Sequence, residues 1–155
     1  MCTGIALAAS DVPLEAAERY GLSGRLHERG GEKEYRFLFR DVPRLLPILH
    51  EGQFQVVRWG RRRGEKGALP CTGWTWLNTL EKGSWQEAHP EEVLIPATMG
   101  LENGRWFAIR EGIRGLVVAD EQGERVAYML CEPASHYYEV MTRSKRMPVL
   151  VNERI

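Results

Sequence analysis

The run Leu116-Val-Val-Ala-Asp-Glu-Gln-Gly-Glu-Arg-Val-Ala-Tyr-Met-Leu-Cys131 has two apolar ends and a polar middle. Both ends are rich in the β-branched and aromatic side chains that suit strands. The polar segment 120–123 contains aspartate and glycine, which are typical of tight turns. The run therefore predicts a β-hairpin, and we expect the fold to contain an antiparallel sheet.

Outward from this hairpin, the chain alternates short apolar runs with turn residues. After an apolar start at 5–9, the expected strands cover 26–28, 35–39, 54–59, 93–97, 106–109 and 147–151. Helices are expected over Leu14–Tyr20, after a proline in the first turn, and from Pro133. Many short strands with two or three short helices predict an α+β fold. We expect its mainly antiparallel sheet to be strongly curved and barrel-like.

Composition narrows the possible functions. The 155 residues are 43% hydrophobic and 27% charged, with 21 Lys+Arg against 21 Asp+Glu, so residues 1–155 are expected to form one domain of zero net charge. Any nucleic-acid binding must then come from a local patch. No run reaches the roughly 18 apolar residues of a membrane span, and the start does not resemble a signal peptide, so a cytoplasmic protein without membrane contact is expected.

Cysteine and histidine usage indicates no metal site and no cofactor. The three cysteines, Cys2, Cys71 and Cys131, are odd in number and contain no CxxC pair, which argues against disulfides and zinc. The four histidines, at 27, 50, 89 and 136, lack the i, i+4 spacing of a metal-binding helix.

Two basic segments are candidates for binding single-stranded DNA. The first joins cations to nearby tryptophans: Arg58, Arg61, Arg62, Arg63 and Lys66, with Trp59, Trp74 and Trp76. The second consists of Arg143, Lys145 and Arg146. Cations that follow phosphates and aromatic faces that stack on bases hold single strands without reading their sequence. The alternative is a solvated arginine loop beside tryptophans of the core.

Cys2 is a candidate nucleophile because a small residue at position 2 permits removal of Met1. The new terminus would carry an α-amine that titrates near ~8 and a thiol that titrates near ~8.5, so some of each is nucleophilic at neutral pH. Such a 1,2-aminothiol condenses with an aldehyde to a five-membered thiazolidine. It also suits an N-terminal nucleophile hydrolase. The alternative is a small buried residue at the start of a strand.

Five segments resemble, in order, the motifs of the SOS-response-associated peptidase (SRAP) family. Met1-Cys2 is similar to its MCGR start, Arg58-Trp59-Gly60 to its RWG, and Leu77-Asn78 to the asparagine of its NAR segment. The segment 94–102 resembles its LIPADGFYE block, with Glu102 at the position of the glutamate. Arg146-Met-Pro-Val-Leu150 resembles the end of its HDRMPVIL block. The resemblance spans almost the whole chain through short islands.

The resemblance implies a protein that binds single-stranded DNA and traps the aldehyde of abasic sites as a thiazolidine. Cys2 would be the nucleophile, Asn78 would orient the amine or the sugar, and Glu102 would transfer protons. The chain departs from the family pattern at three places: Thr3-Gly4 brings no early arginine, Leu80 replaces the arginine of NAR, and Ser144 replaces a histidine. His136 lies eight residues before Ser144, too far along the chain for a simple replacement.

We therefore expect an SRAP-like protein that engages single-stranded or abasic DNA in the DNA damage response. Two alternatives stay open. One is a non-catalytic DNA-binding or adaptor protein with the same fold, which the loss of an imidazole at Ser144 favours. The other is a thiol peptidase or amidase that uses Cys2 on a peptide.

Overall fold

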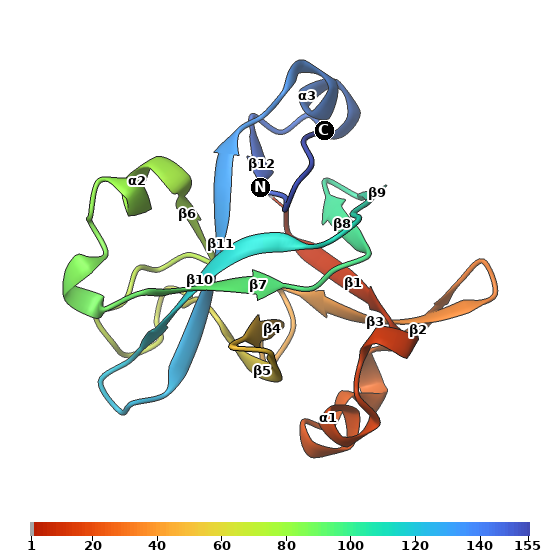
Figure 1. The fold of residues 1–155 in the computed structure, drawn as a ribbon, viewed down its shortest axis with the longest axis horizontal. Helices are drawn as coiled ribbons and strands as arrows, with labels where there is room; N and C mark the ends of the chain where they lie inside the picture. Colours follow the sequence, from red (N-terminus) through yellow and green to blue (C-terminus); the bar gives the residue numbers. More distant parts are fainter. Residues whose placement is uncertain (1) are drawn as a thin grey trace.

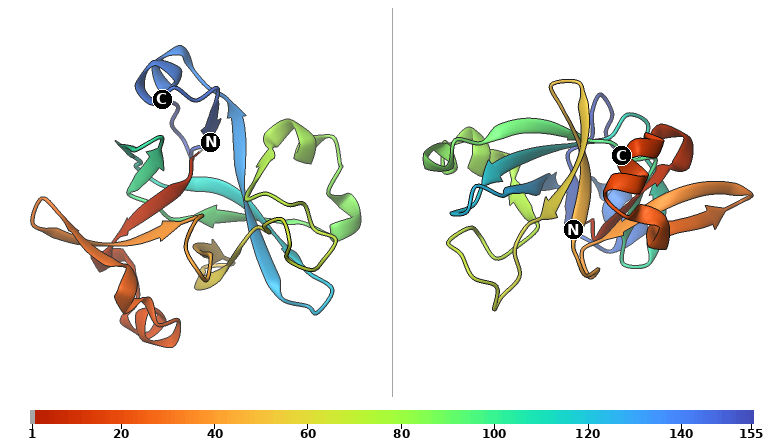
Figure 2. Two further views of the ribbon diagram at one scale, coloured as in Figure 1. Left: turned by 180° about the vertical axis from the view of Figure 1, so that it is seen from behind. Right: turned by 90° about the horizontal axis from the view of Figure 1, so that it is seen from below.

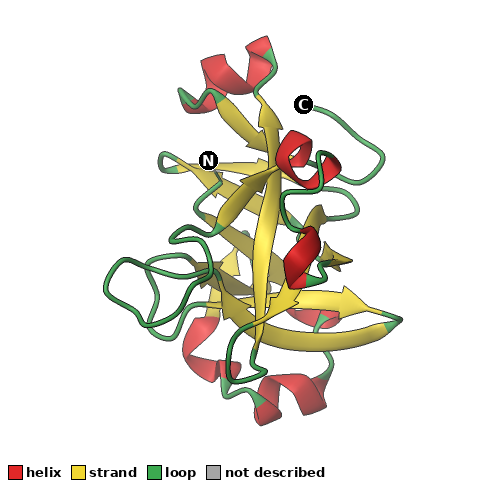
Figure 3. Cartoon of the chain, turned by 90° about the vertical axis from the view of Figure 1, so that its left-hand side faces the viewer, coloured by secondary structure: helices red, strands yellow, loops and turns green. Residues whose placement is uncertain are grey.

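A computed structural model of the chain describes residues 2–155 and has an α+β fold built mainly from strands (Figure 3). A five-stranded antiparallel sheet has the order β2-β3-β1-β8-β9. Its strands are β1 Gly4–Ala8, β2 Leu26–Arg29, β3 Glu32–Leu38, β8 Met99–Glu102 and β9 Arg105–Ala108. Gly30 and Gly31, both with positive φ, form the expected turn between β2 and β3.

The second sheet closes on itself as a barrel (Figure 1). Its five strands are β4 Leu45–His50, β5 Gln53–Trp59, β7 Glu91–Ile95, β10 Ile113–Ala119 and β11 Arg125–Pro133. The hairpin expected at 116–131 is confirmed as β10 and β11, which pair Leu116 with Tyr128. Closure is completed by a short parallel pairing of β5 with β11, at Arg58 with Val126 and Trp59 with Ala127. The curved, mainly antiparallel sheet expected from the sequence is confirmed.

Strand β11 is longer than the barrel needs and carries two further short strands. β6, Trp74–Trp76, pairs with it in parallel, and β12, Arg146–Pro148, pairs with it antiparallel. The register places Trp76 and Pro148 on opposite sides of Cys131. Segments 74–76 and 146–148 are therefore brought together although about seventy residues separate them.

Three short α-helices and three 3₁₀ turns connect the strands. The helices are α1 Leu14–Arg19, α2 Leu77–Glu81 and α3 His136–Thr142; the turns are η1 Ala9–Asp11, η2 Leu22–Arg25 and η3 Gln86–Ala88. None of the helices formed by residues 2–155 has the length and apolarity of a bilayer crossing. The helix expected from Pro133 begins three residues later, because β11 continues to Pro133 and Ser135 is the N-cap.

One large core joins the two sheets. It contains Ile5 and Phe37 of the open sheet together with Leu46, Ile48 and Ile113 of the barrel. These side chains are fully buried, so each contributes roughly 1.5–3 kcal/mol of hydrophobic stabilisation. The N-terminal end of β1 lies beside α3 and β12 (Figures 1 and 2).

Candidate functional site

Cys2 lies immediately before β1 and is held inside the protein. Its thiol is 1% exposed and donates a hydrogen bond to the Gly4 carbonyl oxygen at 3.1 Å. The indole Nε1 of Trp74 donates to the Cys2 carbonyl oxygen at 2.8 Å. Thr3 N donates to Leu101 O at 2.7 Å, which fixes this end of the chain against β8. Cys2 therefore has a defined position between β6 and β8.

Glu102 ends β8 next to Cys2, as the matched order of the two residues predicted. Gly4 pairs with Leu101, so the residue after Leu101 faces the segment that precedes Gly4. The Glu102 side chain is 3% exposed, which is unusual for a carboxylate. Burial is the main cause that raises the thiol pKa of Cys2 to about 12, and the charge of Glu102 raises it further. The two side chains therefore interact.

Burial also raises the pKa of Glu102, while a hydrogen bond with the Ser144 side chain acts in the opposite direction. Ser144 is itself buried, and its hydroxyl donates to the Arg146 carbonyl oxygen at 2.9 Å. The structure thus brings Cys2, Glu102 and Ser144 together, as we expected. Burial thus favours the protonated form of the Glu102 carboxyl group, which can then act as a proton donor as well as an acceptor.

Tyr138 is a fourth member of this cluster, and sequence reasoning missed it. It lies on α3, is fully buried, and packs edge-on against Phe107 with ring centroids 5.3 Å apart. Its hydroxyl has no hydrogen-bond partner within residues 2–155. The pKa of Tyr138 is raised by burial and by the charges of Cys2 and Glu102, so the phenol stays protonated at neutral pH. In the sequence, the four-residue spacing of Tyr138 and Thr142 could have indicated that both lie on the buried face of a helix. It could not have indicated which residues pack against that face.

Asn78 follows β6 closely, but no contact in the described part of the chain ties it to the cluster. It lies on α2, is exposed, and its side chain makes no hydrogen bond with residues 2–155. β6 ends at Trp76, and α2 begins directly afterwards. The expected role of Asn78 in orienting the amine or the sugar therefore stays a prediction.

Two tryptophans of the expected DNA-binding set are core residues. Trp59 is fully buried and its Nε1 donates to Gly73 O at 2.9 Å, and Trp74 is bonded to Cys2. Both pack with Phe39, at ring-centroid distances of 5.2 and 4.7 Å. The expectation that they stack on bases is therefore wrong, because a base cannot reach their faces. Trp76 is half-buried, with the Arg146 guanidinium 4.9 Å from its ring centroid.

The arginines of the first basic segment differ in what they contact. Arg58 forms ion pairs with Asp120 at 3.1 Å and Glu124 at 3.0 Å, so its charge is compensated. Arg61 donates to the carbonyl oxygens of Leu69 and Glu65, and Arg62 donates to that of Phe39. Arg63 is exposed and has no hydrogen bond or ion pair with residues 2–155. The segment is therefore a folded loop and not a uniform row of free cations.

The second basic segment surrounds the Cys2 cluster. Arg143, Lys145 and Arg146 are exposed, while Ser144 between them is buried beside Glu102. Arg143 ends α3 with φ 61, and this left-handed conformation turns the chain from α3 into β12. These three cations are therefore next to Ser144 in the sequence and lie at the surface.

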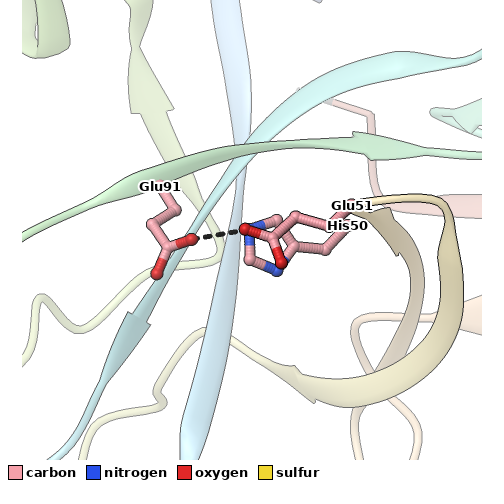
Figure 4. Close-up of side chains that lie close together, drawn as sticks. All are labelled: His50, Glu51 and Glu91. Carbon is pink, nitrogen blue, oxygen red and sulfur yellow. Dashed lines mark ion pairs between the residues drawn. The ribbon is translucent and has the colours of Figure 1, made fainter.

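A possible metal-binding group lies elsewhere, on the barrel (Figure 4). Ligand atoms of His50, Glu51 and Glu91 lie within 4.8 Å of one another, and His50 Nε2 is 2.6 Å from a Glu91 oxygen. However, Arg125 Nη2 lies 2.9 Å from His50 Nδ1. A guanidinium can only donate, so Nδ1 accepts and the proton sits on Nε2, facing Glu91. This arrangement leaves His50 no lone pair for a cation.

Comparisons add no relative: no protein-family model matches the chain, and neither does any curated protein or solved structure. The resemblance to SRAP proteins therefore rests on the five sequence motifs alone.

Proposed function

We propose that the chain binds single-stranded DNA and, once Met1 is removed, cross-links abasic sites through Cys2. Met1 itself lies outside the described residues. The observation that carries the proposal is the burial of the Glu102 carboxyl group against Cys2, with Ser144 and Tyr138 beside it. These side chains come from three segments far apart in the sequence, around residues 2, 102 and 138–144, and the fold gathers them at one end of β1.

The chemistry needs one proton acceptor that later becomes a donor. Glu102 takes a proton from the Cys2 ammonium, and the free amine adds to the aldehyde carbon to give a carbinolamine. Glu102 returns the proton to the hydroxyl, which leaves as water and gives an iminium ion. The thiol sulfur then adds to the iminium carbon, and its proton goes to the Glu102 carboxylate. The aldehyde carbon ends bonded to nitrogen and sulfur, with one water released.

Tyr138 fits this sequence as a neutral hydrogen-bond donor. Its raised pKa keeps the phenol protonated, so it can donate to the carbinolamine oxygen at any physiological pH. Ser144 stands where the family has histidine, and a hydroxyl cannot take up a proton at neutral pH. Tyr138 would supply the donor that Ser144 does not.

Arg143 and Lys145 would hold the strand beside the cluster. Both side chains are exposed, and the two residues lie on either side of Ser144 in the sequence, just before β12. Phosphate contacts position a strand without reading its sequence, as lesion capture requires.

A second candidate function is DNA binding without chemistry. It is favoured by the state of the Cys2 thiol, which is 1% exposed, donates to Gly4 O and has a pKa of about 12. A thiol in this state is a poor nucleophile. Capture of an aldehyde then requires that loss of Met1 or binding of DNA opens the cluster.

The test begins with the intact mass of the purified protein, which reports whether Met1 is lost. The processed protein is then incubated with an abasic single strand and analysed by denaturing electrophoresis after heating. We expect a heat-stable adduct that Cys2→Ala abolishes, and Cys2→Ser, which closes a less stable ring, should yield little. Ser144→His should speed the reaction. A processed protein that binds the strand without any adduct would establish the non-catalytic function.

A further inference from the structure

A cavity of about 720 Å³ opens on the barrel, between β4, β5 and the loops around residues 41–44 and 61–65. It contains none of the four residues of the Cys2 cluster. Its volume is within the range of small-molecule sites and much too small for a folded partner. The cavity is therefore a separate feature that the proposed function does not use.

The lining carries more positive than negative charge. Five arginines line it, Arg44, Arg58, Arg62, Arg63 and Arg125, against three acidic residues. Each acid already has an arginine partner: Asp41 pairs with Arg25 at 2.9 Å, Glu65 with Arg44 at 2.5 Å, and Glu124 with Arg58 at 3.0 Å. The three carboxylates are therefore already paired and do not neutralise the remaining arginines of the lining.

Three of the lining arginines have guanidinium groups without a carboxylate partner within residues 2–155. Arg62 donates to the Phe39 carbonyl oxygen, with its guanidinium 5.3 Å from the Phe39 ring centroid. Arg125 contacts Gln55 and His50, and Arg63 makes no hydrogen bond with the described chain. A guanidinium has five N–H donors, so each of the three keeps donors that only water satisfies. Arg62 and Arg125 are also held in place by their neutral partners.

Apart from Gln55, the uncharged side chains of the lining are apolar or aromatic. Val42 is 90% exposed at this site, and Pro43, Leu45 and Val56 continue the surface toward the barrel. Tyr20 adds an aromatic ring to the lining. A lining that combines apolar side chains with uncompensated cations suits a ligand that has an apolar or flat body and a compact anionic group.

We propose that this cavity binds an organic phosphate monoester with a flat apolar body, such as a nucleoside monophosphate. A phosphate monoester carries about −1.5 to −2 charge at neutral pH and three acceptor oxygens, which matches three uncompensated guanidinium groups better than a single carboxylate does. The same chemistry occurs in a free nucleotide and at the 5′-phosphorylated end of a DNA strand. We favour the free nucleotide because the volume of the cavity suits a small molecule. The site is independent of Cys2.

The proposal can be tested by isothermal titration calorimetry, in which the full chain is titrated separately with adenosine 5′-monophosphate, adenosine and inorganic phosphate. We expect the monophosphate to bind at least about tenfold more tightly than either part alone, because only it can contact both the apolar side chains and the arginines of the lining. Arg63→Gln should weaken it by about tenfold, a loss typical of one charged hydrogen bond. Arg63 is exposed and bonds to nothing else in the described chain, so this variant should fold normally.

Two controls separate this site from the Cys2 cluster. Lys145→Gln removes an exposed cation there, and Cys2→Ala removes the thiol, and both should leave monophosphate affinity unchanged. Equal affinity for adenosine and its monophosphate, or equal affinity in Arg63→Gln, would overturn the proposal. A third result would also overturn the proposal. If a 5′-phosphorylated oligonucleotide binds, the mononucleotide does not, and Arg63→Gln weakens binding of the oligonucleotide, then the end of a DNA strand is the ligand.

Discussion

The phenols of Tyr138 and Tyr128 are a matched pair for testing the Cys2 cluster. Both residues are fully buried, but among residues 2–155 only the Tyr128 hydroxyl has a partner, the Pro70 carbonyl oxygen at 2.9 Å. Tyr128→Phe should therefore lower the free energy of unfolding by about 1 kcal/mol, the usual net value of a hydrogen bond. Tyr138→Phe should leave it unchanged or raise it, because it removes a buried polar group that has no partner. Urea denaturation measures both, and a clear loss of stability in Tyr138→Phe would contradict the arrangement described.

Glu102 should make stability depend on pH in a predictable direction. Its pKa is raised by burial, so the folded protein binds the proton more tightly than the unfolded chain does. The stabilisation is complete below the ordinary glutamate pKa of about 4.3 and is lost as pH rises through the folded value. Glu102→Gln removes this loss. The free energy of unfolding of Glu102→Gln should therefore equal that of the wild type in acid, and should exceed it by an increasing amount as the pH rises toward neutral. A gain that is the same at every pH would show that Glu102 does not titrate abnormally.

At the residue scale, the sequence linked Cys2 to Glu102 only through the resemblance to a family. No strand was expected over residues 99–102, and the β1–β8 pairing of Gly4 with Leu101 is what brings the two residues together. Burial likewise depends on neighbours from other segments. Trp59 looks like a stacking platform in the sequence, yet Phe39 and Gly73 enclose it. Tyr138 could not be assigned to the Cys2 cluster from the sequence, because its burial also depends on residues from other segments.

At the element scale, the turn from α3 into β12 should carry the binding of single strands. Each neutralised phosphate of a single strand contributes about −0.7 to the slope of log Kobs against log salt. The double variant Arg143→Gln with Lys145→Gln should therefore make that slope shallower by about 1.4. Lys33→Gln, on the distant β2–β3 hairpin, is the matched control and should change nothing. Fluorescence titration of a labelled oligonucleotide at several salt concentrations gives the slopes, and equal slopes would remove this turn from the proposed interface.

Some elements escaped prediction for identifiable reasons. β4 contains Pro47, and a proline normally argues against an inner strand because it cannot donate to the ladder. Here β4 pairs fully with β5 but meets β7 only at Leu49 with Leu94, so the missing N–H costs little. β6 is only three residues long and depends on its parallel pairing with β11. The hairpin of β10 and β11 was predicted because its pattern is local and does not depend on pairing with a distant segment.

At the scale of the whole molecule, closure of the barrel is the feature that no local pattern contains. The β5–β11 contact joins strands that lie far apart in the sequence, and it consists of only two residue pairs. It is extended by Gly60 N, which donates to the Ala127 carbonyl oxygen at 2.8 Å directly after β5. The chain then folds back so that Arg61 N donates to Thr72 O at 3.1 Å. Gly60 thus lies where the barrel closes and where the loop toward β6 begins.

Gly60→Ala should show how much stability depends on this closure. Gly60 has φ 58, and a Cβ there would overlap the Thr72 carbonyl, which is backbone and cannot move aside without losing its bond to Arg61. Gly30 is the matched control, because it has φ 57 and a Cβ there would meet no atom within 4 Å. Gly30→Ala should cost only the left-handed conformation, about 1–2 kcal/mol. Gly60→Ala should cost roughly 1–3 kcal/mol more, the typical penalty of overpacking. Urea denaturation of the two variants compares them directly, and equal losses would mean that the barrel tolerates a shift of its closing segment.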